Sequence, residues 1–141
     1  MATATTWIPT AADAGHCRSI EQEAYGKSAT LKQWEKLLAD PAAVVLATFT
    51  AVAVVKEIEG QLRLILVAVK RRARRQGIGR KLVQLLCEYG ELELKLPETD
   101  LAALRFATAV GFKPQRLERD GYGNCDAIWL RSVSVAKVNP D

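Results

Sequence analysis

Residues 62–80 constrain the fold more than any other part of the chain. This stretch starts as an apolar run typical of a strand, passes through a basic loop with two glycines and continues into a segment with helical periodicity. Leucines alternate with charged residues at 92–96, beyond that helix, which indicates another strand. Because a strand–helix–strand crossover packs its two strands in one sheet, we expect an α+β fold whose central strand pair is parallel.

Turn residues and hydrophobic spacing predict the remaining elements. Helices are expected over residues 10–25, 30–39, 79–89 and 100–110, since capping residues, glycines or a proline bound each of them. Further strands are expected at residues 7–8, 44–49, 52–58, 116–118 and 127–133, where apolar or β-branched residues cluster. The prediction is therefore a mixed central sheet of about seven strands with about four helices.

Composition fits one globular domain over residues 1–141 and excludes several kinds of chemistry. The chain is 49% hydrophobic and 26% charged, as ordinary globular domains are. With three cysteines and one histidine it forms neither a paired disulfide framework nor a four-ligand zinc site, so we expect no metal. Its apolar stretches are too short to span a membrane, and its first residues lack a signal-peptide pattern. We therefore expect a cytoplasmic protein with no membrane contact.

The basic loop has the composition of a phosphate-binding site. Gly77 and Gly79 remove side chains where backbone amides must approach a phosphate, and the helix that follows offers unpaired N–H groups. Arg74, Arg75 and Arg80 supplement these amides, and a net charge of +4 suits an anionic ligand. The glycine spacing matches neither an ATP P-loop nor a dinucleotide fingerprint. A polyanionic cofactor, a solvated charged face and a nucleic-acid site remain open, although no aromatic residue lies among the arginines to stack on bases.

Two ordered motifs resemble those of the GNAT superfamily of N-acyltransferases. Residues 74–79, Arg-Arg-Gln-Gly-Ile-Gly, are similar to the family's acyl-CoA signature Arg/Gln-x-x-Gly-x-Gly/Ala, and they follow an apolar strand. Residues 100–112 resemble its second motif, Asn-x-x-Ala ending in Gly-Phe, with Asp100 in place of the asparagine. Residues 19–25 and 119–128 further resemble RimI-type ribosomal-protein N-terminal acetyltransferases.

The resemblance implies that acetyl-CoA lies in a V between two splayed parallel strands. The strand backbone would pair with the pantetheine arm, and an amide of Val67 or Val69 would stabilise the developing oxyanion. The amides of residues 75–79 would hold the pyrophosphate, with Arg74 and Arg80 near the phosphates. The cofactor-binding residues implied are Val67, Ala68, Val69, Arg74, Arg75, Gln76, Gly77, Ile78, Gly79 and Arg80.

The same resemblance implies direct attack of a primary amine on the thioester within a ternary complex. The chain departs from the family pattern at two catalytic positions, because Ala107 replaces a tyrosine and Lys95 replaces the glutamate of RimI-type enzymes. Tyr122 is the expected replacement acid, and Glu93 is the expected base, acting through water. A turn aromatic and a solvated strand carboxylate are the plain alternatives for these two residues.

The acceptor implied by the RimI-type similarity is a protein N-terminus. A small-molecule amine remains an alternative acceptor, and a non-catalytic acyl-CoA or nucleic-acid binding module remains an alternative function. The expected partners are an amine substrate and no membrane, with nucleic acid disfavoured and a homodimer left open.

Overall fold

The computed structural model describes residues 5–132, and these build one mixed sheet. The sheet has six strands in the order β1-β2-β3-β4-β6-β5. Their bounds are β1 Ala43–Ala47, β2 Ala51–Ile58, β3 Gln61–Val69, β4 Leu92–Pro97, β5 Lys113–Glu118 and β6 Ala127–Arg131. The α+β class with a central parallel pair is confirmed, since β3 and β4 are parallel and all other neighbours are antiparallel.

The strand expected at residues 7–8 is the one element that the structure corrects. Trp7 makes a single antiparallel bridge to Ala47, with both N···O distances at 2.9 Å. Pro9 follows directly and has no N–H to extend a ladder, and Thr10 already caps a short 3₁₀ turn. The described residues therefore contain six strands rather than seven. Val133, the last residue of the strand expected at 127–133, lies outside the described residues.

Four α-helices form where the capping signals predict them. Their bounds are α1 Ala14–Tyr25, α2 Leu31–Leu38, α3 Ile78–Leu86 and α4 Leu101–Val110. Thr30 and Gln33 make the predicted capping box of α2, and the Asp100 carboxylate accepts the Ala103 N–H at 3.1 Å to cap α4. Short 3₁₀ segments at 11–13, 71–73 and 87–89 complete the helical structure. Over residues 5–132, none of the helices has the length and apolarity that a bilayer crossing requires.

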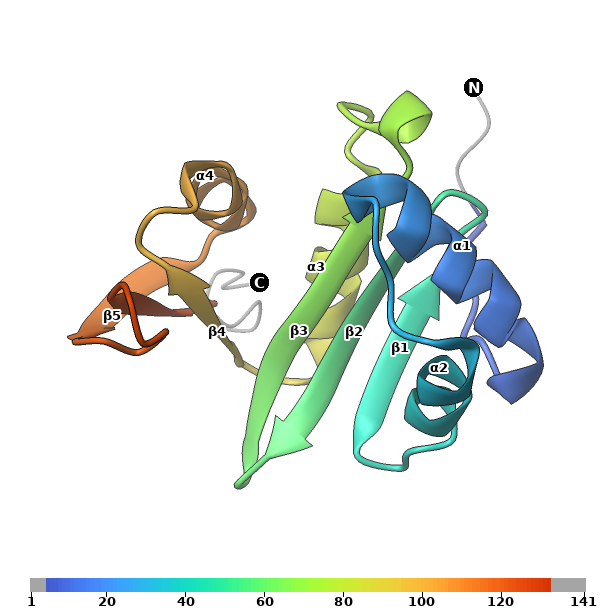
Figure 1. The fold of residues 1–141 in the computed structure, drawn as a ribbon, viewed down its shortest axis with the longest axis horizontal. Helices are drawn as coiled ribbons and strands as arrows, with labels where there is room; N and C mark the ends of the chain where they lie inside the picture. The colour runs from blue at the N-terminus through green and yellow to red at the C-terminus, as the bar shows by residue number, and fades with distance from the viewer. Residues whose placement is uncertain (1–4, 133–141) are drawn as a thin grey trace, which may run out of the picture.

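The β1–β3 part of the sheet is covered on both faces, and strand β2 shows how (Figure 1). Its Val52 and Val54 belong to a cluster with α1 and α2, whereas Ala53 and Val55 belong to the cluster around α3. Since successive side chains of a strand point to opposite faces, α1 and α2 lie on one face and α3 lies on the other.

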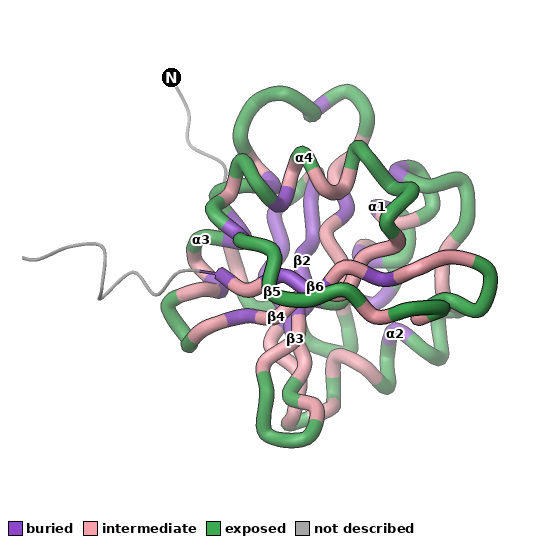
Figure 2. Tube along the Cα trace, turned by 90° about the vertical axis from the view of Figure 1, so that its left-hand side faces the viewer, coloured by how far each residue is buried: buried purple, intermediate pink, exposed green. Residues whose placement is uncertain are grey.

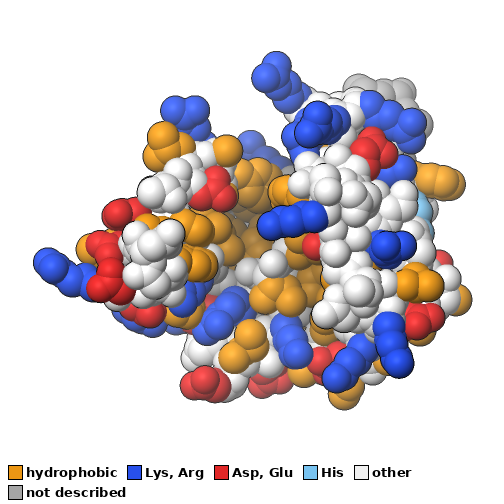
Figure 3. Space-filling model, in the orientation of Figure 1, with side chains coloured by type: hydrophobic (Ala, Val, Ile, Leu, Met, Phe, Trp, Pro, Cys, Tyr) orange, Lys and Arg blue, Asp and Glu red, His pale blue; other side chains and the backbone are white. Residues whose placement is uncertain are grey.

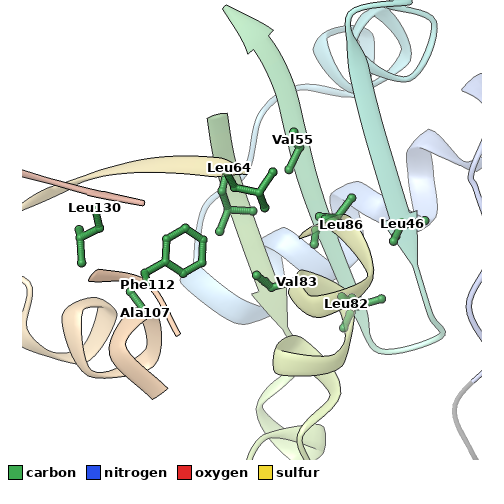
Figure 4. Packing of buried hydrophobic residues seen from close by; sticks show 12 residues of the cluster. Leu46, Val55, Leu64, Leu82, Val83, Leu86, Ala107, Phe112 and Leu130 are labelled. Carbon is green, nitrogen blue, oxygen red and sulfur yellow. The ribbon is translucent and has the colours of Figure 1, made fainter. Parts of the chain in front are cut away.

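Helix α4 and strands β4–β6 form a second half that packs against the first through one shared core. Phe112 and Leu130 from this half lie in one cluster with Leu64 and Val83 of the β3–α3 half (Figure 4). Viewed from the β5 side, buried segments gather in the middle of the molecule and β5 is exposed along nearly its whole length (Figure 2). The two halves therefore share one hydrophobic core next to the region where β3 and β4 separate.

Candidate active site

Strands β3 and β4 are paired for only two rungs and then diverge. The parallel register consists of Leu62 with Leu92 and Arg63 with Glu93. Beyond this vertex, β3 continues to Val69, while β4 leans away from it on the side of α4 (Figure 1) and stays paired with β6. A bulge accompanies the divergence, because Val54 and Val55 of β2 face residues 66 and 64 of β3 and skip the residue between them. The predicted splayed pair is therefore present.

Beyond the vertex, β3 directs backbone polar groups into the V. The Val67 carbonyl accepts a hydrogen bond from the Tyr25 hydroxyl, and the Val69 carbonyl accepts one from Arg74 Nε at 3.2 Å. In an antiparallel ladder the N–H and C=O of one residue point to the same side, so the amides of these two valines also face away from β2. This edge can pair with the amides of an extended ligand.

The facing edge of β4 is open in the same way. Leu92 exchanges hydrogen bonds with Ser132 on the β6 side. Because backbone groups alternate along a strand, those of Glu93 and Lys95 point the other way, toward β3. The Lys95 carbonyl is one of these groups, and it accepts a hydrogen bond from the Tyr122 hydroxyl at 3.0 Å. The hydroxyls of Tyr25 and Tyr122 thus each donate a hydrogen bond to one carbonyl on opposite edges of the V, that of Val67 and that of Lys95.

The loop that follows β3 presents the backbone as an anion-binding turn. Gly77 caps α3 in the left-handed conformation with φ 76°, and Arg75 two residues earlier has φ 66°. The first hydrogen bond of α3 runs from the Lys81 N–H to the Gly77 carbonyl, so the N–H groups at the start of this helix have no partner within it. Successive amides in this conformation form a concave donor surface for a phosphate.

Gly79 allows α3 to lie against β3. A Cβ at this position would be 3.2 Å from the Val69 side chain and 3.4 Å from that of Val67. The first turn of α3 is therefore held directly beside the open edge of β3, and the two glycines of the loop have different tasks. Gly77 supplies the backbone conformation, and Gly79 supplies the close approach.

A cavity of about 680 Å³ extends along the V from the α3 N-terminus. It is hollowed between the two halves of the molecule, with apolar side chains inside and Lys and Arg side chains along its margin (Figure 3). Eight of the ten predicted cofactor-binding residues line it, namely Val67, Val69, Arg74, Arg75, Gly77, Ile78, Gly79 and Arg80. Ala68 is instead buried against α1, and Gln76 is exposed outside the lining.

Arg74 makes contacts that the sequence did not indicate. Its Nη2 donates to the Ala24 carbonyl at 2.8 Å while its Nε donates to Val69, so this guanidinium ties the end of α1 to the open edge of β3. Arg75 and Arg80 are exposed at the cavity margin, close to the free N–H groups of α3. Arg74, Arg75, Arg80 and the helix terminus therefore all contribute positive charge to this end of the cavity, with the Arg74 side chain held in place by its two carbonyl partners.

Glu93 lies at the vertex of the V and outside the main cavity. One of its oxygens, Oε2, accepts from Arg63 Nε at 2.9 Å and from Arg63 Nη2 at 2.8 Å, and its side chain is only 13% exposed. It lines a second cavity of about 310 Å³ on the open face of β4, β6 and β5. Its second oxygen is the group that a water molecule could use.

Tyr122 and Lys95 are held together on the β4 edge of the V, and neither of them is in the lining of the main cavity. The Lys95 ammonium donates to the Gly121 carbonyl at 3.0 Å and lies 4.9 Å from the centre of the Tyr122 ring. Burial raises the pKa of the Tyr122 hydroxyl above its ordinary value of 10.0, with nearby Cys125 and Glu118 acting in the same direction. This hydroxyl therefore stays protonated at neutral pH. Lys95, for its part, fixes the turn that carries the tyrosine.

Tyr25 is a site residue that sequence reasoning missed. It is the last residue of α1, and its side chain lines the main cavity although residues 25 and 67 are far apart in the sequence. Burial is also the largest cause that raises the pKa of its hydroxyl, while the Arg74 charge acts in the opposite direction. Only the packing of α1 across β3 brings this hydroxyl to the V, and no local pattern encodes that packing.

The adjacent His16 and Cys17 do not form a nucleophilic pair. His16 Nε2 is 2.9 Å from the Thr48 carbonyl, and the buried Cys17 thiol has its pKa raised to about 12, mainly by desolvation. A thiol with such a pKa is not ionised at neutral pH. Within residues 5–132, no group of His, Cys, Asp and Glu side chains is arranged to hold a metal ion.

Comparison with known proteins agrees with this geometry. A family model described as acetyltransferase (GNAT) family matches residues 16–112. Comparison with curated protein sequences finds no match. The fold is similar to the ribosomal-protein-S18-alanine N-acetyltransferase from Escherichia coli, with 21% identity, 92% of this chain and 93% of that chain covered, and a TM-score of 0.73.

Two further solved structures share the fold. Arabidopsis thaliana NAA60 in complex with acetyl-CoA matches with 12% identity, coverage of 92% of this chain and 98% of that chain, and a TM-score of 0.77. A putative GNAT-family acetyltransferase from Desulfovibrio desulfuricans matches with 17% identity, coverage of 95% and 100%, and a TM-score of 0.79. With the family model covering most of the chain and the splayed strands and glycine loop in place, the chain belongs to the acetyltransferase (GNAT) family and is an acetyl-CoA-dependent N-acetyltransferase.

Proposed function

We propose that the chain transfers the acetyl group of acetyl-CoA to the N-terminal amine of a protein by direct attack in a ternary complex. The observation that carries this proposal is the V itself. Its cavity extends along the open edge of β3 from the α3 N-terminus, and β3 and β4 meet at its vertex. The second cavity, on the face of β4, β6 and β5, reaches Glu93 at this vertex. Such a V can position a thioester and an amine together, which lowers the entropic part of the barrier.

The residues present fit acetyl-CoA at the places that the sequence suggested. The unpaired N–H groups at the start of α3, with Arg75 and Arg80 beside them, would hold the pyrophosphate. The backbone of Val67 and Val69 would pair with the pantetheine arm once the Tyr25 hydroxyl and Arg74 release their carbonyls. When bound, the coenzyme supplies an acetyl thioester and leaves as a thiol.

The chain must then stabilise the negative charge on the acetyl oxygen, accept a proton from the amine and donate a proton to the sulfur. The amine nitrogen attacks the acetyl carbon, a C–N bond forms, the C–S bond breaks, and the amine loses a proton while the sulfur gains one. A backbone amide of Val67 or Val69 would stabilise the negative charge on the acetyl oxygen. Tyr122 would donate the proton to the sulfur, because its hydroxyl is protonated and stands on the β4 edge of the V.

Glu93 would accept the proton of the amine through water. Its position at the vertex supports this role, and Oε1 is the oxygen that Arg63 does not contact. Lys95 stands where RimI-type enzymes have a glutamate, and here it holds the Gly121 carbonyl instead. Of the two carboxylates on this face, Glu93 is the one at the vertex, and we assign the role of base to it.

A protein N-terminus is favoured as acceptor by the similarity of fold to the ribosomal-protein-S18-alanine N-acetyltransferase from Escherichia coli. A panel of acceptors with thiol release as the readout tests this choice. We expect turnover with free N-terminal peptides. Turnover with polyamines or aminoglycosides alone would assign a small-molecule amine. Acetyl-CoA binding without turnover on any acceptor would assign a non-catalytic binding module.

A further inference from the structure

The face of β4, β6 and β5 that borders the vertex carries a surplus of positive charge. Cross-strand register places the side chains of two rungs on this face, one running Glu93, Arg131, Lys113 and the next Lys95, Trp129, Arg116. Arg63 of β3 extends the first rung, and Glu118 completes the face. This cationic face therefore has five cations (Arg63, Lys95, Lys113, Arg116 and Arg131) against two carboxylates.

Both carboxylates of the cationic face are already engaged by the protein. Glu93 accepts two hydrogen bonds from Arg63, and Glu118 accepts one from the Trp129 indole N–H at 2.8 Å. Glu118 also lies 3.9 Å from Lys95 and 3.9 Å from Arg116. Among residues 5–132, the ion pairs of these two carboxylates are with Arg63, Lys95 and Arg116, and five cations against two carboxylates leave this face a net positive charge.

Register even sets like charges side by side. Lys113 and Arg131 are direct cross-strand partners, an arrangement that destabilises a sheet unless an anion lies between them. Arg116 is 60% exposed and its guanidinium carbon lies 4.6 Å from the centre of the Trp129 ring. Arg116 and Arg131 line the cavity of about 310 Å³ together with Glu93 and Trp129.

From this arrangement we infer that the acceptor is an acidic peptide, with Asp or Glu side chains in the positions that directly follow the reacting amine. The inference rests on the proposed function, since it concerns the part of the acceptor that lies beyond the vertex of the V. Carboxylates in these positions would meet Arg116 and Arg131 at the rim of the cavity, where charge pairs set specificity and association rate.

A nucleic acid is the other polyanion that such a surface could attract. Binding of single strands relies on exposed aromatic rings for base stacking. Trp129 is only 9% exposed, because Arg63 and Arg116 lie against its ring at 4.7 and 4.6 Å from the centre. The ring is closed to a base, and the cations above it remain available to carboxylates.

The test compares three peptides of equal length with free N-termini that begin Ser-Asp-Glu, Ser-Ser-Gln and Ser-Lys-Arg. We expect kcat/KM for the acidic peptide to exceed that for the basic one by at least roughly 10-fold at low salt, mainly through KM. The preference should shrink toward unity as NaCl rises from about 0.05 to 0.5 M. Equal efficiency for all three peptides, or preference for the basic one, would overturn the inference.

A charge reversal with a matched control assigns the effect to the face. Arg116→Glu should lower the acidic-to-basic preference by roughly 10-fold and leave the Kd for acetyl-CoA unchanged. Arg18→Glu, an equal charge change at an exposed position of α1, should leave the preference as it is. An unchanged preference in Arg116→Glu overturns the inference. A second result would also overturn it: acetylation is inhibited by an oligonucleotide and is not inhibited by the acetylated form of the acidic peptide. The face would then bind nucleic acid.

Failure of this inference is distinguishable from failure of the proposed function. If all three peptides are acetylated alike, the function stands and the acidic preference is wrong. If acetyl-CoA binds and none of the peptides releases thiol, the function itself is wrong.

Discussion

Arg63 donates two hydrogen bonds, at 2.9 and 2.8 Å, to a single oxygen of Glu93 at the last paired rung of β3 and β4. This pair fixes the vertex of the V and at the same time restricts the carboxylate that we propose as the base. A structural role for Glu93 would affect stability, and a catalytic role would affect turnover, so the two roles can be tested separately.

Glu93→Gln should lower both stability and turnover. The lost ion pair should cost about 1–3 kcal/mol of the free energy of unfolding, since both side chains are largely buried. Loss of the base should lower kcat by roughly 100-fold. Arg63→Gln breaks the same pair and also removes the contact with the Trp129 ring, so it should lose at least as much stability, but it keeps the carboxylate and should retain much more activity. Equal kcat in the two variants would show that Glu93 acts only as a structural residue.

Tyr122→Phe should lower kcat by roughly 10- to 100-fold with little change in the Kd for acetyl-CoA. The raised pKa of Tyr122 means that its protonated form persists up to pH 10 and is lost as pH rises through the higher value. The wild type should therefore keep its activity up to about pH 10 and lose it above, and the variant should lack this alkaline limb. Tyr89→Phe is the control, since Tyr89 is an exposed tyrosine in the 3₁₀ turn at 87–89, whereas the Tyr122 hydroxyl is bonded to the Lys95 carbonyl on β4. Unchanged kcat in Tyr122→Phe would remove the hydroxyl from the mechanism.

Tyr25→Phe should bind acetyl-CoA more tightly than the wild type. The Tyr25 hydroxyl occupies the Val67 carbonyl, which the pantetheine arm needs, and the coenzyme must displace it. A neutral hydrogen bond is worth about 0.5–1.5 kcal/mol, so the Kd should fall by roughly 2- to 10-fold. Calorimetric titration measures the change. A weaker affinity would mean that the hydroxyl contacts the bound coenzyme instead of competing with it.

Gly77→Ala should weaken acetyl-CoA binding by at least roughly 10-fold, because the left-handed turn that aims the amides would be strained. Gly60→Ala is a close control. Gly60 has φ 79° against 76° for Gly77, and a Cβ has open space at both positions. Both variants should lose about 1–2 kcal/mol of stability, and only the first should lose affinity. Equal affinities in the two variants would contradict the assignment of the pyrophosphate site.

Local sequence rules predicted most of the fold because neighbouring residues determine the features concerned. The Thr30 capping box, the Gly60 hairpin and the glycine that begins α3 each depend on a few consecutive residues. The same holds for the glycine loop at residues 74–79, because the residues that set its backbone conformation are contiguous. The prediction of a strand at residues 7–8 was wrong because Pro9 ends the pairing after one bridge. The strand propensity of residues 7 and 8 does not take this proline into account.

The acceptor side of the site depends on sheet order and could not be predicted in the same way. Strand β6 lies between β4 and β5, so Trp129 and Arg131 become neighbours of Lys95 and Glu93 only in the folded sheet. The contact of Tyr25 with β3 likewise requires α1 to cross the sheet. The resemblance to RimI-type enzymes suggested Glu93 as a base because it lies two residues before Lys95, but only the register revealed its pairing with Arg63.

The central claim is that the backbone of the β3–α3 turn and the open edge of β3 bind the coenzyme. A crystal structure of the acetyl-CoA complex tests it most directly. We expect the pyrophosphate on the amides of residues 75–79 and the pantetheine arm paired with Val67 and Val69, with the Tyr25 hydroxyl displaced. Coenzyme bound elsewhere, with the Tyr25 hydroxyl still on Val67, would contradict it.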